Sequence, residues 1–200
     1  MFVDVYAPAE YNTTVANGSV PVSISVDTAF PYGTGIKVAV ISSAPGSASF
    51  DVSLRLPTWA AIPSIAILLN GSPFITGAPG TYVHITRVWG ANDVLQFDVP
   101  MAIEAHEYTG VTQLPPFKRY AYTYGPILLA VTAPANWNAT IGTIHLPAIL
   151  GSAPNTWVVP ANDGNPLHWA ITSVAGALLQ PSWEIDAPHA RFSVYPAFDL

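Results

Sequence analysis

Apolar and polar residues alternate along much of the chain, as they do in β-strands that have one buried face. Residues 20–26 place valine and isoleucine at every second position, with serines between them. Residues 50–56 and 95–99 show the same alternation, and each is followed at once by a proline, Pro57 and Pro100. Proline has no amide hydrogen to donate to a neighbouring strand. The pattern therefore predicts half-buried strands that end at these two prolines.

Other apolar runs are rich in β-branched and aromatic residues, and they predict further strands at 36–41, 65–69, 82–89, 120–124, 127–131, 141–146, 157–159, 168–171 and 192–195. The opening residues 1–6 also resemble a strand. No stretch carries an apolar stripe with the helical period, and twenty prolines are spread through the chain. The sequence therefore predicts an all-β protein made of one or two antiparallel, jelly-roll-like β-sandwiches.

Two turn-forming sequences separate groups of predicted strands. Asn70-Gly71 favours a tight hairpin turn, although Pro73 is expected to prevent a regular two-residue hairpin. The segment 108–117 contains the pair Pro115-Pro116 and is the predicted link between two β units. We therefore expect a first β-sandwich in residues 1–108 and a second β region in residues 109–200.

The composition narrows the class of protein. Half of the 200 residues are hydrophobic and 9% are charged, which suits a large core. Six basic residues against twelve acidic ones give a net charge of -6, and the basic residues are scattered, so nucleic-acid binding is not expected. Apolar runs such as 127–131 are far shorter than the roughly 20 residues of a membrane-spanning helix, so no membrane partner is expected.

The chain contains no cysteine, which excludes disulfides, thiolate metal sites and a thiol nucleophile within it. Its first residues lack the basic and apolar segments of a secretion signal. Four N-glycosylation motifs nevertheless suggest a secreted glycoprotein whose front end is missing, and they lie at Asn12, Asn17, Asn70 and Asn138.

No catalytic or metal-binding residue can be assigned from motifs. Glu104, His106 and Glu107 form the densest polar cluster, for which a metal or acid/base pair competes with the more ordinary interpretation of a solvated strand end. The other histidines lack the short spacings of metal ligands, and they are His84, His145, His168 and His189.

Six tryptophans and nine tyrosines suit sugar stacking as well as packing between sheets. Trp59 and Trp89 follow or end predicted strands, which favours a structural role. Trp137 lies between two asparagines in a loop-like stretch and is the candidate carbohydrate-binding residue.

A series of short motifs covers nearly the whole chain in a consistent order. The sharpest are Leu54-Arg55-Leu56-Pro57-Thr58-Trp59-Ala60 and Leu69-Asn70-Gly71. The others lie at 2–9, 27–32, 79–82, 87–89, 92–93, 97–101, 124–130, 137, 157–160, 179–181 and 192–195. Together they resemble the C-terminal β-sandwich region of glycoside hydrolase family 127, the β-L-arabinofuranosidase-like enzymes, and the last of them resemble plant-type members.

The resemblance implies that a catalytic α/α-barrel precedes this region and is absent from the chain. It also implies a cysteine nucleophile held by a zinc-thiolate site, with a glutamate as acid/base. Because the chain has no cysteine, no catalytic residue and no cofactor is carried over, and zinc would belong to the barrel.

The residues that match the family motif receive structural roles instead. Arg55 is expected to pair with a buried or interfacial acid, Trp59 and Trp89 to anchor the core, and Gly71 to form the turn. The full motif set is Arg55, Pro57, Trp59, Asn70, Gly71, Trp89, Asp93, Gly125 and Pro126.

The leading hypothesis is therefore a non-catalytic β-sandwich that braces the catalytic barrel of its own parent protein and is inactive alone. Two alternatives remain open: a free-standing carbohydrate-binding module that recognises arabinose-containing glycans through exposed aromatic residues, and a purely structural or adhesion module.

Overall fold

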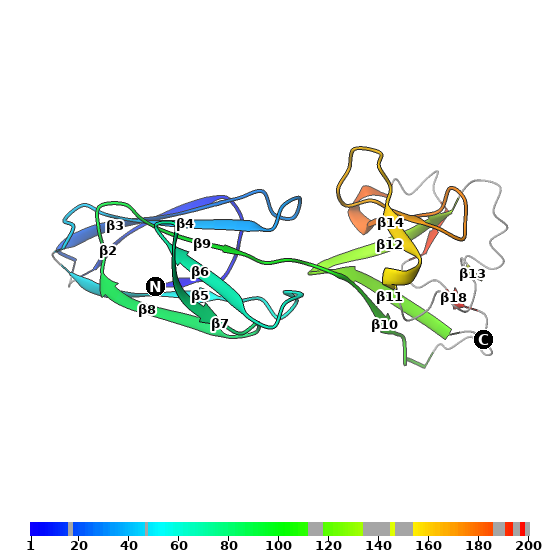
Figure 1. The fold of residues 1–200 in the computed structure, drawn as a ribbon, viewed down its shortest axis with the longest axis horizontal. Helices are drawn as coiled ribbons and strands as arrows, with labels where there is room; N and C mark the ends of the chain where they lie inside the picture. Colours follow the sequence, from blue (N-terminus) through cyan, green and yellow to red (C-terminus); the bar gives the residue numbers. More distant parts are fainter. Residues whose placement is uncertain are drawn as a thin grey trace. The chain divides into compact units, whose positions relative to one another are not determined.

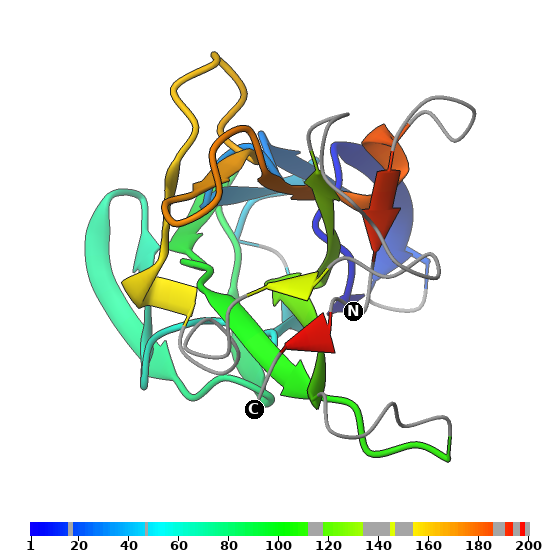
Figure 2. The same cartoon turned by 90° about the vertical axis from the view of Figure 1, so that its right-hand side faces the viewer.

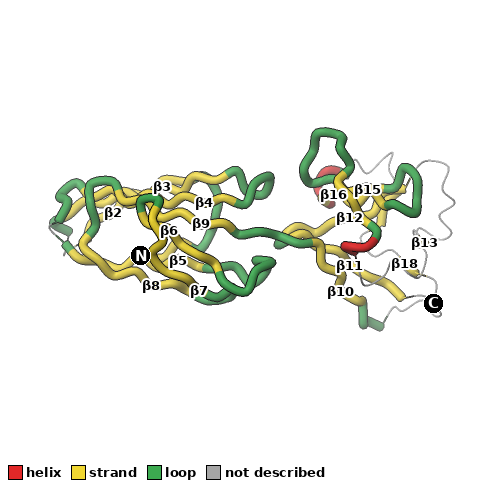
Figure 3. The backbone as a smooth tube through the Cα atoms, in the orientation of Figure 1, coloured by secondary structure: helices red, strands yellow, loops and turns green. Residues whose placement is uncertain are grey.

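A computed structural model describes residues 1–15, 18–46, 48–111, 118–133, 145–146, 154–185, 191–193 and 197–198. It divides the chain into two compact units, Met1–Met101 and Ala102–Leu200. The described residues contain strands, loops and short 3₁₀ turns but no α-helix (Figure 3). The predicted all-β class is confirmed.

The first unit contains two sheets (Figure 1). The smaller has the strand order β1 (Phe2–Val3), β5 (Ser49–Arg55) and β8 (Tyr82–Val88). The larger has the order β2 (Ala9–Val15), β3 (Val20–Thr28), β4 (Gly35–Ser42), β9 (Asp93–Asp98), β6 (Ile65–Leu69) and β7 (Ser72–Gly77).

The apolar faces of these two sheets meet in one core. Val38 and Leu95 from the larger sheet are fully buried, as are Val52 and Leu54 from the smaller one. These are positions that the alternating pattern assigns to the interior. The first unit is therefore a β-sandwich whose outer faces carry the polar positions of the same strands.

The larger sheet curls so that β7 approaches the smaller sheet, and a glycine permits the contact. A Cβ atom at Gly77 would lie 2.4 Å from both Leu56 Cδ1 and Val83 Cγ2. Both of those side chains are buried. A residue with no side chain is therefore needed where β7 closes this edge of the sandwich.

The hairpin between β6 and β7 has a two-residue turn. Asn70 and Gly71 both have positive φ, 51° and 81°, and Leu69 lies opposite Ser72. Pro73 leaves the two-residue turn intact, but the expected departure from a regular hairpin is present as a register shift between Ile67 and Leu68, next to that proline's partner.

The second unit is built on one mixed sheet (Figure 2). Its main path is β13 (His145–Leu146), β18 (Ala197–Phe198), β11 (Lys118–Tyr124), β12 (Ile127–Ala133), β16 (Leu178–Pro181), β15 (Trp169–Ile171) and β14 (Val158–Pro160). Off this path, β10 (Ile103–Glu107) pairs with β11 and β17 (Arg191–Ser193) pairs with β12. The 3₁₀ turns are η3 (Pro154–Thr156) and η4 (Ser182–Glu184).

The segment 108–117 connects two strands of this second unit and does not link the units. Strands β10 and β11, which flank it, are antiparallel neighbours with Ile103 opposite Tyr124 and Glu107 opposite Tyr120. Residues 102–108 therefore fold with the second unit, and the division falls after Met101. The pairing of β10 with β11, and not the local proline content, determines to which unit residues 102–108 belong.

The second core gathers around Tyr122, Leu129, Trp157 and Leu179, each no more than 2% exposed. Gly125 has a φ of 55° and, with Pro126, forms the turn between β11 and β12. This is the position that the sequence assigned to the start of an apolar strand.

Candidate functional site

Several of the motif residues form one polar cluster in the first unit. The Asp93 side chain accepts hydrogen bonds from Asn70 Nδ2 and from the Gly90 amide, each at 2.8 Å. Arg87 Nη2 lies 3.5 Å from the same carboxylate. The Asn70 side chain also accepts from the Val94 amide at 2.8 Å. The cluster ties the β6–β7 turn to the loop before β9.

Asp93 is charged and nearly buried. Burial raises its pKa, but the hydrogen bonds from Gly90 and Asn70 and the charge of Arg87 outweigh burial and hold the pKa below its usual range. With 7% of the residue exposed, this carboxylate is enclosed by partners that already use its oxygens. Its arrangement is that of a structural ion, not of an acid/base group that meets a substrate.

Trp89 completes this cluster from the core side. It is 1% exposed, donates from Nε1 to the Phe50 carbonyl at 3.0 Å, and stacks on the Phe50 ring. The Arg87 guanidinium lies 5.4 Å from its ring centroid. Trp59 is partly buried against the same core and stacks on Phe30. Both tryptophans are placed as core anchors.

Arg55 has no buried acidic partner among the described residues. It occupies an outward position of β5 opposite Tyr82 and is exposed. Within the described part of the chain its guanidinium forms no ion pair. The strand alternation that buries Leu54 and Leu56 directs Arg55 to the outer face, so its partner is not a buried acid of the described residues. An acid at an interface with another domain stays a prediction.

The outer face of the three-stranded sheet carries a serine, a histidine and an aspartate in contact. Ser53 Oγ lies 2.5 Å from Asp51 Oδ2 and 2.9 Å from His84 Nδ1. Thr86 Oγ1 donates to Asp51 Oδ1 at 3.1 Å. Burial raises the pKa of Asp51, but the hydrogen bonds from Ser53, Thr86 and His84 lower it below its usual range.

This trio does not have the geometry of a hydrolytic triad. A nucleophilic serine must reach the substrate and pass its proton to the histidine. Ser53 is fully buried and its hydroxyl donates to Asp51, so the histidine is not the group that receives its proton. The trio therefore orders the sheet surface and offers no nucleophile.

Aromatic side chains surround His84 on this face. Phe2 is 66% exposed and packs edge-on against both Tyr82 and His84, and the Tyr82 and His84 rings are stacked. Tyr82 donates from its hydroxyl to Asp4 at 2.8 Å. The outer face of this sheet is thus a partly apolar surface flanked by Arg55.

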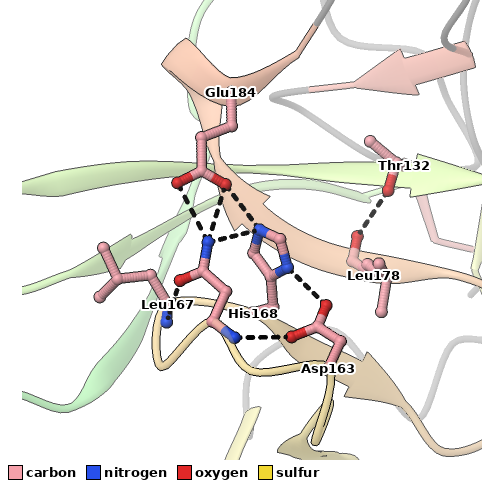
Figure 4. A network of polar contacts seen from close by, with 7 residues as sticks. Thr132, Asp163, Leu167, His168, Leu178 and Glu184 are labelled. Atoms are coloured by element: carbon pink, nitrogen blue, oxygen red, sulfur yellow. Dashed lines mark hydrogen bonds and ion pairs between the residues drawn. The ribbon is translucent and has the colours of Figure 1, made fainter. Parts of the chain in front are cut away.

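The second unit contains a network centred on His168 (Figure 4). Its Nδ1 lies 2.6 Å from Asp163 Oδ2 and its Nε2 lies 2.6 Å from Glu184 Oε2. Asn165 donates from Nδ2 to both Glu184 oxygens, and its own side-chain oxygen accepts from the Leu167 amide. The network fastens the loop before β15 to η4.

Both ring nitrogens of His168 face carboxylate oxygens, an arrangement that favours the protonated imidazolium. Burial lowers its pKa, but the hydrogen bonds and charges of Asp163 and Glu184 outweigh burial and raise the pKa above the usual value. An imidazolium with both nitrogens donating has no lone pair for a metal or for proton abstraction.

His84 and His106, the other histidines whose side chains the structure describes, do not build a metal site either, and the side chains of His145 and His189 lie outside the described part of the chain. His106 contacts Thr123 Oγ1 at 2.9 Å and lies 3.9 Å from Glu104, while Glu107 pairs with Lys118. Among the residues that the structure describes, no group of three or more His, Cys, Asp or Glu side chains could hold a metal ion.

The predicted glycan-related residues divide into two groups. Trp137, Asn17 and Asn138 lie outside the described residues. Asn12 is exposed on β2, whereas the Asn70 amide is engaged with Asp93 and Val94. Asn70 in the folded chain is therefore a turn residue whose side chain is already in use.

Sequence reasoning missed both His-centred clusters. Alternation placed Asp51 and Ser53 on one side of a strand, but His84 joins them only through the register of β5 against β8. Asp163 and His168 are close in sequence, whereas Glu184 approaches from another element. Only pairing between distant segments could have revealed either cluster.

A family model described as "Beta-L-arabinofuranosidase, GH127 middle domain" matches residues 1–101, which is the first unit. No curated protein sequence matches the chain. Within the described residues, no helix has the length and apolarity needed to cross a membrane.

Three solved structures resemble the chain. A GH127 beta-L-arabinofuranosidase from Geobacillus stearothermophilus T6 aligns over 73% of this chain and 22% of its own, at 23% identity and a TM-score of 0.58. A structure described as a glycoside hydrolase aligns over 100% and 36%, at 16% identity and 0.67. A GH127 beta-arabinofuranosidase aligns over 99% and 34%, at 15% identity and 0.65. At these identities the likeness shows the fold alone. The chain spans between 22% and 36% of the length of these proteins.

Proposed function

Since the chain belongs to glycoside hydrolase family 127 through the middle domain in residues 1–101, we propose that it braces the catalytic domain of a longer β-L-arabinofuranosidase-like enzyme and is inactive alone. The observation that carries this proposal is the match of a complete structural unit to the family's middle domain. The second unit would be a C-terminal β-sandwich of the same parent, in a plant-type arrangement.

The share of each solved structure that this chain covers supports a longer parent. The aligned regions make up 22%, 36% and 34% of those chains. A parent of similar length would contain a large further region in which a catalytic domain can lie.

The chemistry of the chain supports a non-catalytic role. The resemblance implies a cysteine nucleophile, and the chain has none. The serine of the Asp51–Ser53–His84 trio is buried. Zinc is not accommodated by the described residues, since no suitable group of ligands converges among them. We therefore assign the nucleophile, the zinc site and the acid/base residue to the catalytic domain of the parent.

The outer face of β1, β5 and β8 is the proposed contact with that domain. Phe2 and Val88 expose 66% and 49% of their surfaces there, and the Arg55 guanidinium has no ion pair among the described residues. An exposed apolar face beside an unpaired cation fits a surface that packs against another domain. Arg55→Ala should lower the melting temperature of the longer enzyme and leave that of the 200-residue chain unchanged.

Secretion and glycosylation of the parent remain part of the proposal, resting on the four sequence motifs. Glycopeptide mass spectrometry of the protein from its source should find a glycan on Asn12, whose side chain is exposed. A protein without any glycan would contradict the secreted assignment.

The size of the native product tests the central claim. An antibody against residues 155–165, which are mostly exposed, should detect a band well above 21.2 kDa in source material. The purified chain should not hydrolyse an aryl β-L-arabinofuranoside. A native band near 21.2 kDa, or turnover of that substrate, would refute the proposal.

A further inference from the structure

The outer face of the six-stranded sheet carries an open groove that none of the contacts described above uses. Its volume is about 560 Å³, within the range of about 300–1,000 Å³ typical of small-molecule sites. Strands β3, β4, β9 and β6 form its floor. Its polar side chains are Asp27, Thr28, Lys37, Gln96 and Asp98, of which Thr28 already donates to the Gly35 carbonyl.

Strand register aligns these side chains in a row. Asp27 lies opposite Lys37, and Lys37 lies opposite Gln96. Gln96 in turn lies opposite Leu68 on β6. Opposed residues on neighbouring strands point to the same face, with strands about 4.8 Å apart. The row therefore presents a carboxylate, an ammonium, an amide and an apolar side chain side by side.

Small residues keep the groove open along this row. Ala66 is exposed on β6, and Gly35 lies opposite Asp98. A Cβ atom at Gly35 would come within 3.6 Å of Asp98 Oδ1. Bulkier side chains at these places would occupy the volume that is now free.

Three polar groups of the row have no partner within the described part of the chain. Asp27, Lys37 and Gln96 form no side-chain hydrogen bond or ion pair there. Other polar side chains of the same sheet are engaged: Glu10 accepts from Ser23, and Asp98 accepts from Thr34. Polar side chains that line a groove and have no hydrogen-bond partner within it are available to bind a ligand.

The charges select the class of ligand. Two carboxylates disfavour an anion, and the ammonium between them disfavours a cation. Alternating acceptors and donors suit hydroxyl groups, which both donate and accept. Leu68 and Ala66 add an apolar edge for ring C–H groups. We propose that this groove binds an uncharged carbohydrate chain.

The proposal that the groove binds an uncharged carbohydrate does not depend on the proposed bracing role. The narrower expectation that the sugar is arabinofuranosyl rests on the proposed function. The test is an NMR titration of the ¹⁵N-labelled 200-residue chain with arabinotriose, with xylotriose, and with the anionic trisaccharide trigalacturonate. Shifts from a neutral sugar should concentrate at residues 27–29, 35–37, 66–68 and 96–98, and trigalacturonate should bind more weakly.

Matched variants locate the site. Lys37→Ala should weaken binding about tenfold, the effect of losing one hydrogen bond from a charged group. Ala66→Ile should block the groove while keeping its polar groups. Lys118→Ala removes an equivalent charge in the second unit and should leave affinity unchanged. Each variant is compared with the parent chain by its amide spectrum, so that a folding defect is recognised.

Binding of arabinotriose with these variant effects supports both carbohydrate binding in the groove and an arabinofuranosyl ligand. Binding of xylotriose alone supports the groove and refutes the arabinofuranosyl ligand. Binding of trigalacturonate alone, no binding of either neutral sugar, or equal weakening by Lys118→Ala and Lys37→Ala would overturn the proposal.

Discussion

Trp89 combines nearly complete burial with three directed contacts: a hydrogen bond to Phe50, a stacked ring and the Arg87 guanidinium. Trp89→Ala should therefore lower the free energy of unfolding of the first unit by about 3–5 kcal/mol, the cost of emptying a large buried site. Urea denaturation of the chain measures this. Trp183→Ala is the control, since Trp183 is 55% exposed. A loss below 1 kcal/mol would show that Trp89 is not a core anchor.

At Gly77 the packing problem is the reverse of that at Trp89, because any added side chain would overfill the site. Gly77→Ala should destabilise the first unit by about 1–3 kcal/mol through contacts with Leu56 and Val83. Ser72→Ala on the same strand, at an exposed position, should change stability little. Equal stability of both variants in thermal melts would contradict the close approach of β7.

The sequence predicted the burial of individual side chains correctly where strand alternation alone determines it. It placed Leu54 and Leu56 inside and, correctly, the intervening positions on the other face. It could not tell that Ser53 on that face is buried, because Phe2 and His84 flank it from neighbouring strands. The motif match also suggested an acid for Arg55, and among the described residues no such partner is present, which leaves the interfacial acid as a prediction.

At the scale of elements, the His168 network predicts a pH-dependent stability of the second unit. The pKa of His168 is raised, so its contribution is complete below about 6.5, the unfolded value, and is lost as the pH rises through the folded pKa. The pKa of Asp163 is lowered, chiefly by its hydrogen bond to His168, so its contribution is lost only in acid, as the pH falls through a folded pKa below 3.8.

Stability of the second unit should accordingly be greatest between about pH 4 and 6.5 and should fall toward pH 9. His168→Gln should lower it by about 1–3 kcal/mol at pH 6 and remove most of the change between pH 6 and 9. Amide signals of β15 and β16, followed in urea, report this unit alone. His106→Gln, which alters a half-exposed histidine, should keep the wild-type pH response. An unchanged profile in His168→Gln would refute the role of the network.

Most predicted strands exist, with ends that differ from the predicted ones by one or two residues in most cases. Strands β2, β7, β10, β16 and β18 were not predicted. Burial patterns explain this for β2 and β7, which are largely exposed, lack a strong apolar alternation and depend on their neighbours β3 and β6 for pairing. An edge strand is defined by its partner more than by its own side chains.

At the scale of the whole molecule, two separate cores predict separate folding. The first core contains only residues of the first unit and the second only residues of the second. A fragment of residues 1–101 should therefore fold alone, with amide chemical shifts matching those of the full chain except near its end. Collapse of those shifts would show that the second unit is required.

The sequence by itself determined the all-β class, the burial of alternate residues and the family, because strand periodicity and short motifs are local properties. The tertiary structure alone decided where the chain divides, that Asp93 gathers Asn70, Arg87 and Gly90, and that Asp27, Lys37 and Gln96 line one groove. These facts depend on register between strands that are far apart in the chain. A one-residue slip would turn each of those side chains to the opposite face, and no local pattern specifies the register.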